Sequence, residues 1–144
     1  MIIDQRNEFS DAAAVTVSAI SNVIDTGAAA GGLGAIDDLY LVIGVDTAAT
    51  AAGAATVTFS LESDSTADLA TSPTVHWQSA AIGKATLIAG YQVCAIEIPK
   101  GFTHERYLGV RYTVTTGPLT AGKFNAFLTK DPNVFRAFDA PAQA

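Results

Sequence analysis

The chain has 144 residues, a length typical of one domain, and such a domain buries roughly 70% of its unfolded surface. It therefore needs neither a disulfide nor a structural metal to fold. Only 15% of the residues are charged, against a typical share of about 25%, and the net charge is −6 with eight scattered lysines and arginines. We do not expect direct binding to DNA or RNA, which would require clustered basic residues.

Small uncharged residues (Ala, Gly, Thr and Ser) take the place of the missing charges. They suit a protein that works against other protein surfaces. They suit equally well a thin β-sandwich with Thr and Ser on its outer faces. The composition leaves both interpretations open.

The N-terminal segment, residues 1–11, carries mixed charges and one aromatic residue, Phe9, which the pattern leaves exposed. The charges stand where a signal peptide would have its apolar core, so no targeting segment is expected. The most apolar run, 39–45, lies between Asp38 and Asp46 and is far shorter than the ~20 residues needed to span a bilayer. We expect a soluble protein, made in a cytoplasm, that does not contact a membrane.

The first half of the chain alternates between extended segments and loops. Alternation begins at Ala13, and a second extended piece is expected at 20–24. The run 39–45 is apolar on both parities, which predicts a central strand covered on both faces. Residues 46–55 are rich in Ala but form a short run interrupted by Gly53, so we expect a loop or at most one helical turn there.

Residues 56–62 show the most regular alternation, with Val57, Phe59 and Leu61 on the inward side. This pattern is typical of a half-solvated antiparallel strand. Further extended segments are expected at 75–80, 86–89 and 91–98.

Residues 99–128 give the clearest architectural signal. Two alternating segments, 106–114 and 122–128, flank Gly117 and Pro118. Pro118 has no N–H for a ladder and Gly117 permits a positive φ, so the pair interrupts the strand. The stretch predicts two scaffold strands joined by a tight loop.

Taken together, the chain shows about eight short strands with turns at close intervals, which predicts an all-β fold, a jelly-roll-like antiparallel β-sandwich. We divide it into an N-terminal arm (1–11), the β-sandwich domain (12–130) and a C-terminal tail (131–144). The tail keeps Phe135 and Phe138 without a strand or helix period. Docking on a neighbouring molecule and packing on its own domain both remain open.

The two histidines do not suggest catalysis. His76 neighbours Trp77 in a short strand, and we expect Trp77 to face the core. His104 stands in a turn beside Glu105 and is predicted to be a surface loop histidine. No second His or Cys follows at metal-ligand spacing, and there is no G-x-S-x-G nucleophile elbow. We expect no enzymatic activity.

Other candidate sites also favour plain structural roles. The Gly-rich segment 27–34 lacks both phosphate-loop patterns. The acidic segment 62–68 lacks the central Gly and terminal Glu of an EF-hand, so we expect a solvated loop. Cys94 is the single cysteine and lies on a predicted strand face, which indicates a buried and inert thiol. No catalytic, cofactor-binding or metal-binding residue is predicted.

Aromatic side chains leave one alternative open. Trp77, Tyr91, Tyr107 and Phe127 would suit an exposed platform on which sugars stack. They would suit equally well the core or a contact between subunits.

A family resemblance rests on the order and spacing of short segments. RYL (106–108), YTV (112–114) and GPLTAG (117–122) resemble the capsid cement, or decoration, proteins of tailed phages. More narrowly, they look like the jelly-roll cement family of some short-tailed phages. Segments that agree in order elsewhere are EFSD (8–11), the strand 39–45, the stretch 51–62, KATL (84–87), GY (90–91) and PKG (99–101). The resemblance covers residues 1–129.

This resemblance implies a non-enzymatic protein on the outer surface of the virion, made in the host cytoplasm. It would clamp neighbouring subunits of the major capsid protein and self-associate, with a dimer favoured over a trimer. We expect the arms to supply contacts to the capsid or to another subunit, through Ile3, Phe9, Phe135 and Phe138, because termini are what a sandwich extends towards neighbours. The alternative is a carbohydrate-binding or host-adhesion module of a virion.

Overall fold

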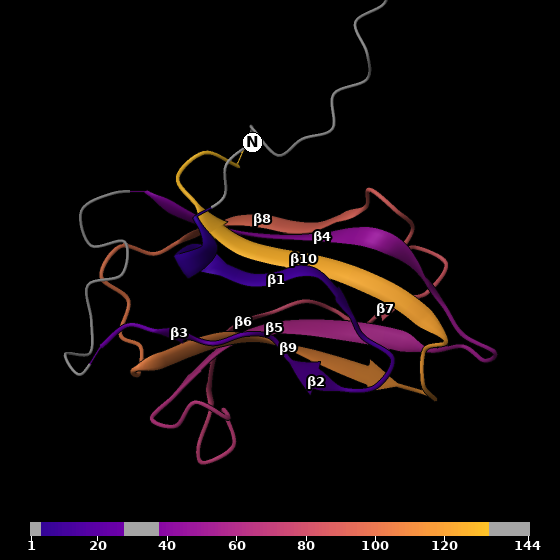
Figure 1. The fold of residues 1–144 in the computed structure, drawn as a ribbon, viewed down its shortest axis with the longest axis horizontal. Helices are drawn as coiled ribbons and strands as arrows, with labels where there is room; N and C mark the ends of the chain where they lie inside the picture. Colours follow the sequence, from indigo (N-terminus) through magenta and orange to yellow (C-terminus); the bar gives the residue numbers. More distant parts are fainter. Residues whose placement is uncertain (1–3, 28–37, 133–144) are drawn as a thin grey trace, which may run out of the picture.

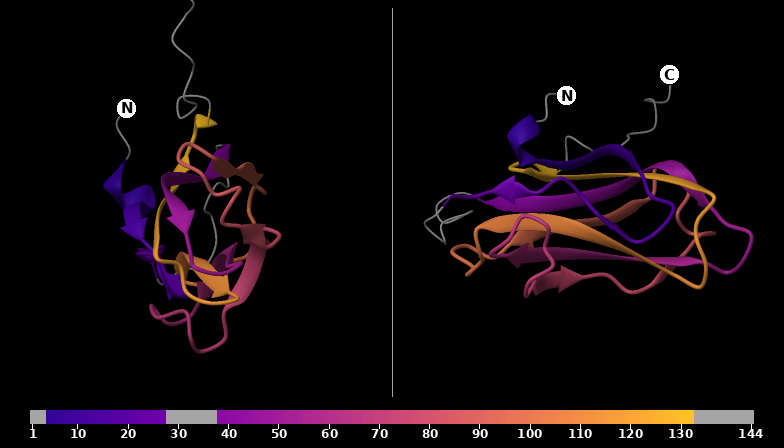
Figure 2. Two further views of the ribbon diagram at one scale, coloured as in Figure 1. Left: turned by 90° about the vertical axis from the view of Figure 1, so that its right-hand side faces the viewer. Right: turned by 60° about the horizontal axis from the view of Figure 1, so that its bottom comes forward.

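Two antiparallel β-sheets pack face to face and are seen as an upper and a lower layer in Figure 1. This computed structural model describes residues 4–27 and 38–132. The strands run lengthwise through the sandwich, so the connecting loops gather at its two ends, as the further views in Figure 2 show. No helix in the described ranges has the length and apolar character to cross a membrane.

The upper layer, sheet A, has four strands in the order β1-β10-β4-β8, and the lower layer, sheet B, has six. Sheet A contains β1 (Glu8–Ala14), β10 (Ala121–Thr129), β4 (Leu39–Thr50) and β8 (Gln92–Ile98). Sheet B contains β2 (Ala19–Ile20), β3 (Ile24–Asp25), β9 (Tyr107–Thr115), β5 (Thr56–Asp64), β6 (Thr74–Gln78) and β7 (Ile82–Gly83). A 3-10 turn, η1 (Gln5–Asn7), precedes β1.

The topology is that of a jelly roll. All strand pairs are antiparallel. Both β2 and β3 pair with β9, and both β6 and β7 pair with β5, so each couple acts as one interrupted strand. The ten strands then reduce to eight, in the orders 1-8-3-6 and 2-7-4-5, which is the strand order of a jelly roll. The predicted jelly-roll-like sandwich is confirmed.

The core lies between the sheets and is centred on three aromatic rings. Phe59 of β5 meets Tyr112 of β9 and Phe124 of β10 edge-on, with ring centroids 5.7 and 5.2 Å apart. Such edge-to-face pairs add about 0.5–1.5 kcal/mol each beyond the burial of their area. The inward face predicted for residues 56–62 is confirmed, since Val57, Phe59 and Leu61 are buried. Strand β9 adds the buried residues Leu108, Val110 and Tyr112 to the core.

Strand β4 is central in sheet A, between β10 and β8, and consecutive residues Leu41, Val42 and Ile43 are all buried. This confirms the strand predicted at 39–45. The strand continues to Thr50, however, so the loop predicted from residue 46 is wrong for 46–50. Pairing with β10 outweighs the helical preference of this Ala-rich run.

The N-terminal boundary of the sandwich also differs from the prediction. Residues 8–11, assigned to the arm, lie in β1 and pair with β10. The strand predicted to begin at Ala13 is displaced, and Val17 beyond it is 60% exposed. A bulge at Ala12, where φ is 44°, is held by the Asn125 side chain, whose Oδ1 accepts a hydrogen bond from the Ala12 N–H.

The loop of residues 65–72 folds back over the outer face of sheet B and projects below it in Figure 1. Leu69 at its centre is fully buried, and its carbonyl accepts a hydrogen bond from Arg111 Nη2 at 2.6 Å. The Leu69 side chain lies so close to Gly109 that a Cβ there would come within 2.8 Å of it. Glycine at position 109 therefore makes room for the loop.

This loop changes the outer face of β5. Ser60 and Glu62 are both 4% exposed, so the prediction of a half-solvated strand is wrong there. Glu62 accepts hydrogen bonds from Arg111 Nε at 2.8 Å and from the Ser60 hydroxyl at 2.7 Å. The buried carboxylate is thus paired with a charged donor, as burial requires.

The two strands predicted within 99–128 are confirmed as β9 and β10. They do not pair with each other, because the loop between them carries the chain from sheet B to sheet A. Thr116 and Gly117 both adopt positive φ, at 65° and 97°, to make this crossing. The Gly-Pro turn therefore closes one end of the sandwich.

Candidate functional site

The predicted contact residue Phe9 lies in the core. Its side chain has no exposed surface, because β1 carries it beneath sheet A against the inner faces of both sheets. The expectation that Phe9 is exposed is wrong, and a side chain without exposed surface has none to offer a second protein. Ile3, Phe135 and Phe138 lie outside the described residues, so their contacts stay predictions.

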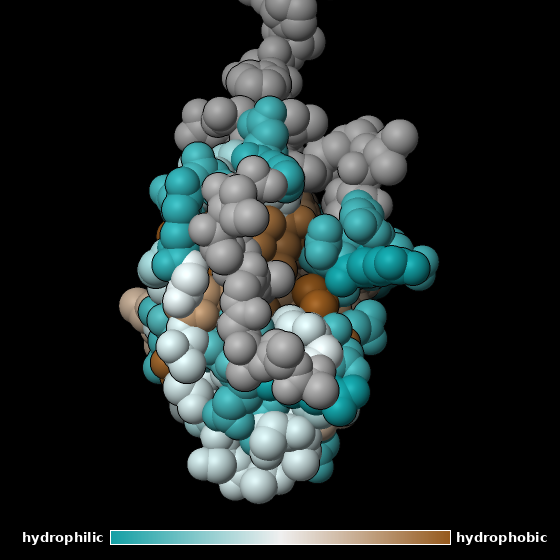
Figure 3. All heavy atoms as spheres, turned by 90° about the vertical axis from the view of Figure 1, so that its left-hand side faces the viewer, coloured by the Kyte–Doolittle hydropathy of each residue, from teal (hydrophilic) through white to brown (hydrophobic). Residues whose placement is uncertain are grey.

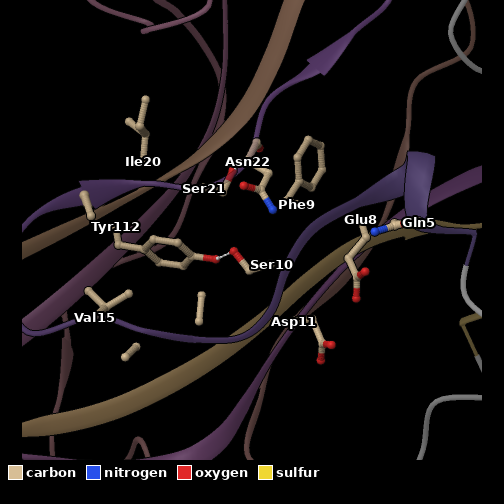
Figure 4. Close-up of a pocket in the computed structure, with 13 residues that line it drawn as sticks. Gln5, Glu8, Phe9, Ser10, Asp11, Val15, Ile20, Ser21, Asn22 and Tyr112 are labelled. Atoms are coloured by element: carbon tan, nitrogen blue, oxygen red, sulfur yellow. Dashed lines mark hydrogen bonds between the residues drawn. The ribbon is translucent and has the colours of Figure 1, made fainter.

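A cavity of about 380 Å³ lies beside β1, at the edge where the two sheets part (Figure 4). Ser10 of β1 and Tyr112 of β9 meet in its wall, with their hydroxyl oxygens 2.7 Å apart. Both side chains are buried. This contact ties sheet A to sheet B.

The groups in this wall are not arranged for catalysis. Burial raises the pKa of Tyr112 to about 12, although the hydrogen bond with Ser10 opposes the shift. The partner of the Ser10 hydroxyl is therefore a neutral phenol, which cannot act as a general base near pH 7. The carboxylates of Glu8 and Asp11 point away from the pair (Figure 4).

A second cavity, of about 720 Å³, is bounded by η1, by residues 22–26 and by His104. Asp25 at its rim accepts two hydrogen bonds of 2.8 Å from the guanidinium of Arg106. These bonds, with one from the Gly27 N–H, lower the pKa of Asp25 to about 2. Asp25 and Arg106 therefore form a bidentate ion pair at the rim of the cavity.

His104 is 2% exposed, so the prediction of a surface loop histidine is wrong. Its ring packs against Phe102, with centroids 5.0 Å apart, and its Nδ1 lies 2.8 Å from the Glu105 carbonyl oxygen. The ring of the other histidine, His76, contacts the same phenylalanine edge-on, with centroids 5.0 Å apart. Trp77 is half-buried and packs against the core, as predicted.

Of the acidic segment predicted to be a solvated loop, Ser65, Ala67 and Asp68 are exposed, whereas residues 62–64 belong to β5 and Asp64 is fully buried. Its oxygens accept hydrogen bonds from the backbone N–H groups of Ser65, Thr71 and Ser72. Burial raises the pKa of Asp64, but these bonds together outweigh it and leave the pKa below its ordinary value. Within 4–27 and 38–132, no three His, Cys, Asp or Glu side chains come together as a metal site.

Cys94 is buried, as predicted, and burial raises the pKa of its thiol to about 12. The four aromatic residues proposed as a sugar platform are not brought together. Trp77 faces the core, Tyr107 lies under the guanidinium of Arg106, and Phe127 is buried on a strand of the other sheet.

Charge is distributed unequally between the two ends of the sandwich. The charged end comprises residues 25–27, 64–73, 99–106 and 130–132 together with Asp38. Its charged residues are Asp25, Asp38, Asp64, Asp68, Lys100, Glu105, Arg106, Lys130 and Asp131. Figure 3 views this end and shows hydrophilic residues around apolar atoms at its centre.

The uncharged end comprises the loops 15–18, 50–55, 79–91 and 116–120, all within the described chain. They contain a single charged residue, Lys84, whose ammonium group donates a hydrogen bond to the Ala51 carbonyl. Val17 and Ile88 at this end are 60% and 59% exposed. The signal was present in the sequence as four charge-poor segments, but only the strand order shows that they share one end.

Hydrogen bonds join these loops into one surface. The Leu119 N–H donates to the Thr16 carbonyl at 2.8 Å, and the hydroxyls of Thr50 and Thr120 lie 2.7 Å apart. On the other side, the Ala49 N–H donates to the Leu87 carbonyl at 2.9 Å. The uncharged end is therefore a connected surface rather than four independent loops.

Comparison with known proteins adds a family. A search of curated proteins finds no match. The model of the Bbp16 family matches residues 9–128, a range that runs from β1 to β10. The family name is of the kind given to bacteriophage proteins. The chain belongs to the Bbp16 family.

Proposed function

We propose that the protein is a phage capsid cement protein, which binds the outer surface of the assembled head and clamps neighbouring major capsid subunits. The observation that carries the proposal is the uncharged end, with exposed Val17 and Ile88. The central parts of protein interfaces are depleted of charged residues, because a charge loses its hydration there. A bacteriophage-type family name and the sequence resemblance support the same function.

The architecture suits a clamp. Three edge-to-face or stacked aromatic contacts and two paired sheets make a rigid body, which presents its end loops without further ordering. A contact of ~800 Å² per partner is ordinary for a protein interface, and a regular shell repeats it many times. Self-association, as a dimer rather than a trimer, and a place on the outer capsid surface belong to this proposal.

The alternative function, a carbohydrate-binding or host-adhesion module, rested on an aromatic platform. Since the structure places Trp77, Tyr107 and Phe127 on different faces, no observation favours this alternative, and we do not propose it.

Electron microscopy of undecorated capsids mixed with the purified protein tests the proposal. We expect extra density on the outer surface at a fixed ratio to the major capsid protein. Capsids that stay bare at saturating protein would overturn the proposal.

Charge substitutions test which surface makes the contact. Val17→Glu places a carboxylate in the uncharged end and should weaken capsid binding at least tenfold. Val75→Glu is the matched control, because Val75 is 51% exposed on the edge strand β6. Both variants should melt within a few degrees of the wild type. Equal weakening by both variants would contradict a role for the uncharged end.

A further inference from the structure

Two imidazole rings contact one phenylalanine ring where the loop 99–106 meets sheet B. The Phe102 centroid lies 5.0 Å from that of His76 on β6 and 5.0 Å from that of His104 in the same loop. Glu105 adds two further links to the sheet. Its N–H donates to Ser63 Oγ of β5 at 3.0 Å, and its carboxylate accepts a hydrogen bond from Thr74 of β6 at 3.1 Å.

The hydrogen bonds of Ser63 favour a neutral His76. Ser63 Oγ accepts from the Glu105 N–H and lies 2.7 Å from His76 Nε2. Ser63 is fully buried, so its hydroxyl proton needs an acceptor, and the lone pair of Nε2 is the one at hand. A proton on Nε2 would leave the Ser63 hydroxyl without that acceptor.

His104 is fixed in the loop by one ring nitrogen and by its ring face. Its Nδ1 donates to the Glu105 carbonyl oxygen at 2.8 Å, and its ring packs against Phe102. Its Nε2 is buried and has no hydrogen-bond partner among the described residues.

We propose that His76, Phe102 and His104 form a proton-operated clasp: with His76 neutral, it holds the loop 99–106 on sheet B, and protonation of His76 opens it. Opening would release the loop from β6, which itself stays paired with β5. The clasp is independent of the proposed capsid function, because it belongs to the charged end.

The neighbours of His76 have opposing effects on its pKa. Glu105 favours a charged His76, whereas burial and the neighbouring His104 disfavour it, and the pKa of His76 is lowered on balance, chiefly by burial. Arg6 and Glu8 line the same cavity as His104.

The remaining charges around the loop already have partners. On β3 and in the loop, Asp25 is paired with Arg106, and Lys100 is paired with Asp38 at 2.8 Å. On β5, Glu62 is held by Arg111, and Asp64 by the loop amides. None of these pairs is free to neutralise an imidazolium.

The direction of the effect on stability follows from linkage. A histidine that is protonated more readily in the unfolded chain than in the fold stabilises the fold above its unfolded pKa, near 6.5. This contribution is lost as pH falls from there. Between pH 7.5 and 5.5, each histidine that takes its proton only on unfolding raises the unfolding constant up to ~10-fold.

Urea unfolding at pH 7.5 and 5.5 tests the clasp on the full chain. The sequence contains only two histidines, so His76→Gln/His104→Gln removes every histidine while keeping side chains that hydrogen-bond. We expect the unfolding constant of the wild type to rise severalfold, up to ~10-fold, between these pH values, and that of the double variant less than ~2-fold. An equal rise in both proteins would overturn the proposal.

Two measurements on the wild type keep the proposal testable if the double variant does not fold. The His76 ring proton signals should titrate with a midpoint below 6.5 by nuclear magnetic resonance, and a midpoint at or above 6.5 would overturn the proposal. Amide exchange, corrected for its intrinsic pH dependence, should lose protection in 99–106 at pH 5.5 while β10 keeps it. Unchanged protection of the loop would equally overturn it.

Discussion

Removing the hydroxyl of Tyr112 should destabilise the fold, because this group and Ser10 tie sheet A to sheet B across 102 residues of sequence. Tyr112→Phe leaves the Ser10 hydroxyl buried without its partner, and Ser10→Ala does the same to the phenol. Leaving a buried hydroxyl unsatisfied costs about 1–3 kcal/mol. Each single variant should therefore lower the free energy of unfolding by that amount.

The double variant should lose less than the sum of the two single losses. It removes both hydroxyls together, so no polar group stays unsatisfied, and the difference gives a coupling of about 1 kcal/mol. Urea unfolding of all four proteins gives this cycle, with Tyr91→Phe as a control at a half-buried tyrosine. Additive losses, or single losses below ~0.5 kcal/mol because water from the adjoining cavity replaces the partner, would refute the reasoning.

Three other outcomes follow from the structure. Cys94 should resist alkylation at pH 8 in the folded protein and react in urea, since burial raises its pKa to about 12; rapid modification without denaturant would contradict this. Leu69→Ala should cost about 2–5 kcal/mol, because the side chain is fully buried against Gly109, and a loss below ~0.5 kcal/mol would show that the loop is not packed. Deletion of 133–144 should weaken capsid binding more than it lowers the melting temperature, and unchanged binding would exclude the tail as a contact.

Local sequence patterns predicted the strands in which apolar and polar residues alternate regularly. The alternation of Val57, Phe59 and Leu61 identified the inner face of β5, and the alternation in 106–114 predicted strand β9. In a sandwich, one face of each strand must meet the opposite sheet, so a period of two is visible in the sequence itself.

The errors came from contacts between distant segments. Glu62 looked solvated because its burial depends on a loop that folds back onto β5 and on Arg111 from another strand. His104 looked exposed, but its ring packs against Phe102, which in turn contacts the distant His76. Phe9 stands among charges in sequence, and only its pairing with β10 turns it inward.

The candidate interaction surface could not be predicted from local sequence patterns either. Residues 15–18 and 116–120 are far apart in the chain, and their shared absence of charge became a surface only when the jelly-roll order placed them together. The resemblance suggested contacts in the arms, whereas the structure adds the uncharged end.

The most direct test of the account is the ratio of this protein to the major capsid protein on decorated capsids, measured by electron microscopy and by sedimentation of the mixture. The account predicts saturable binding at a fixed ratio, with density on the outer surface. At the same protein concentration, less Val17→Glu than Val75→Glu should be bound per major capsid subunit. Capsids that sediment without the protein at every concentration would contradict it.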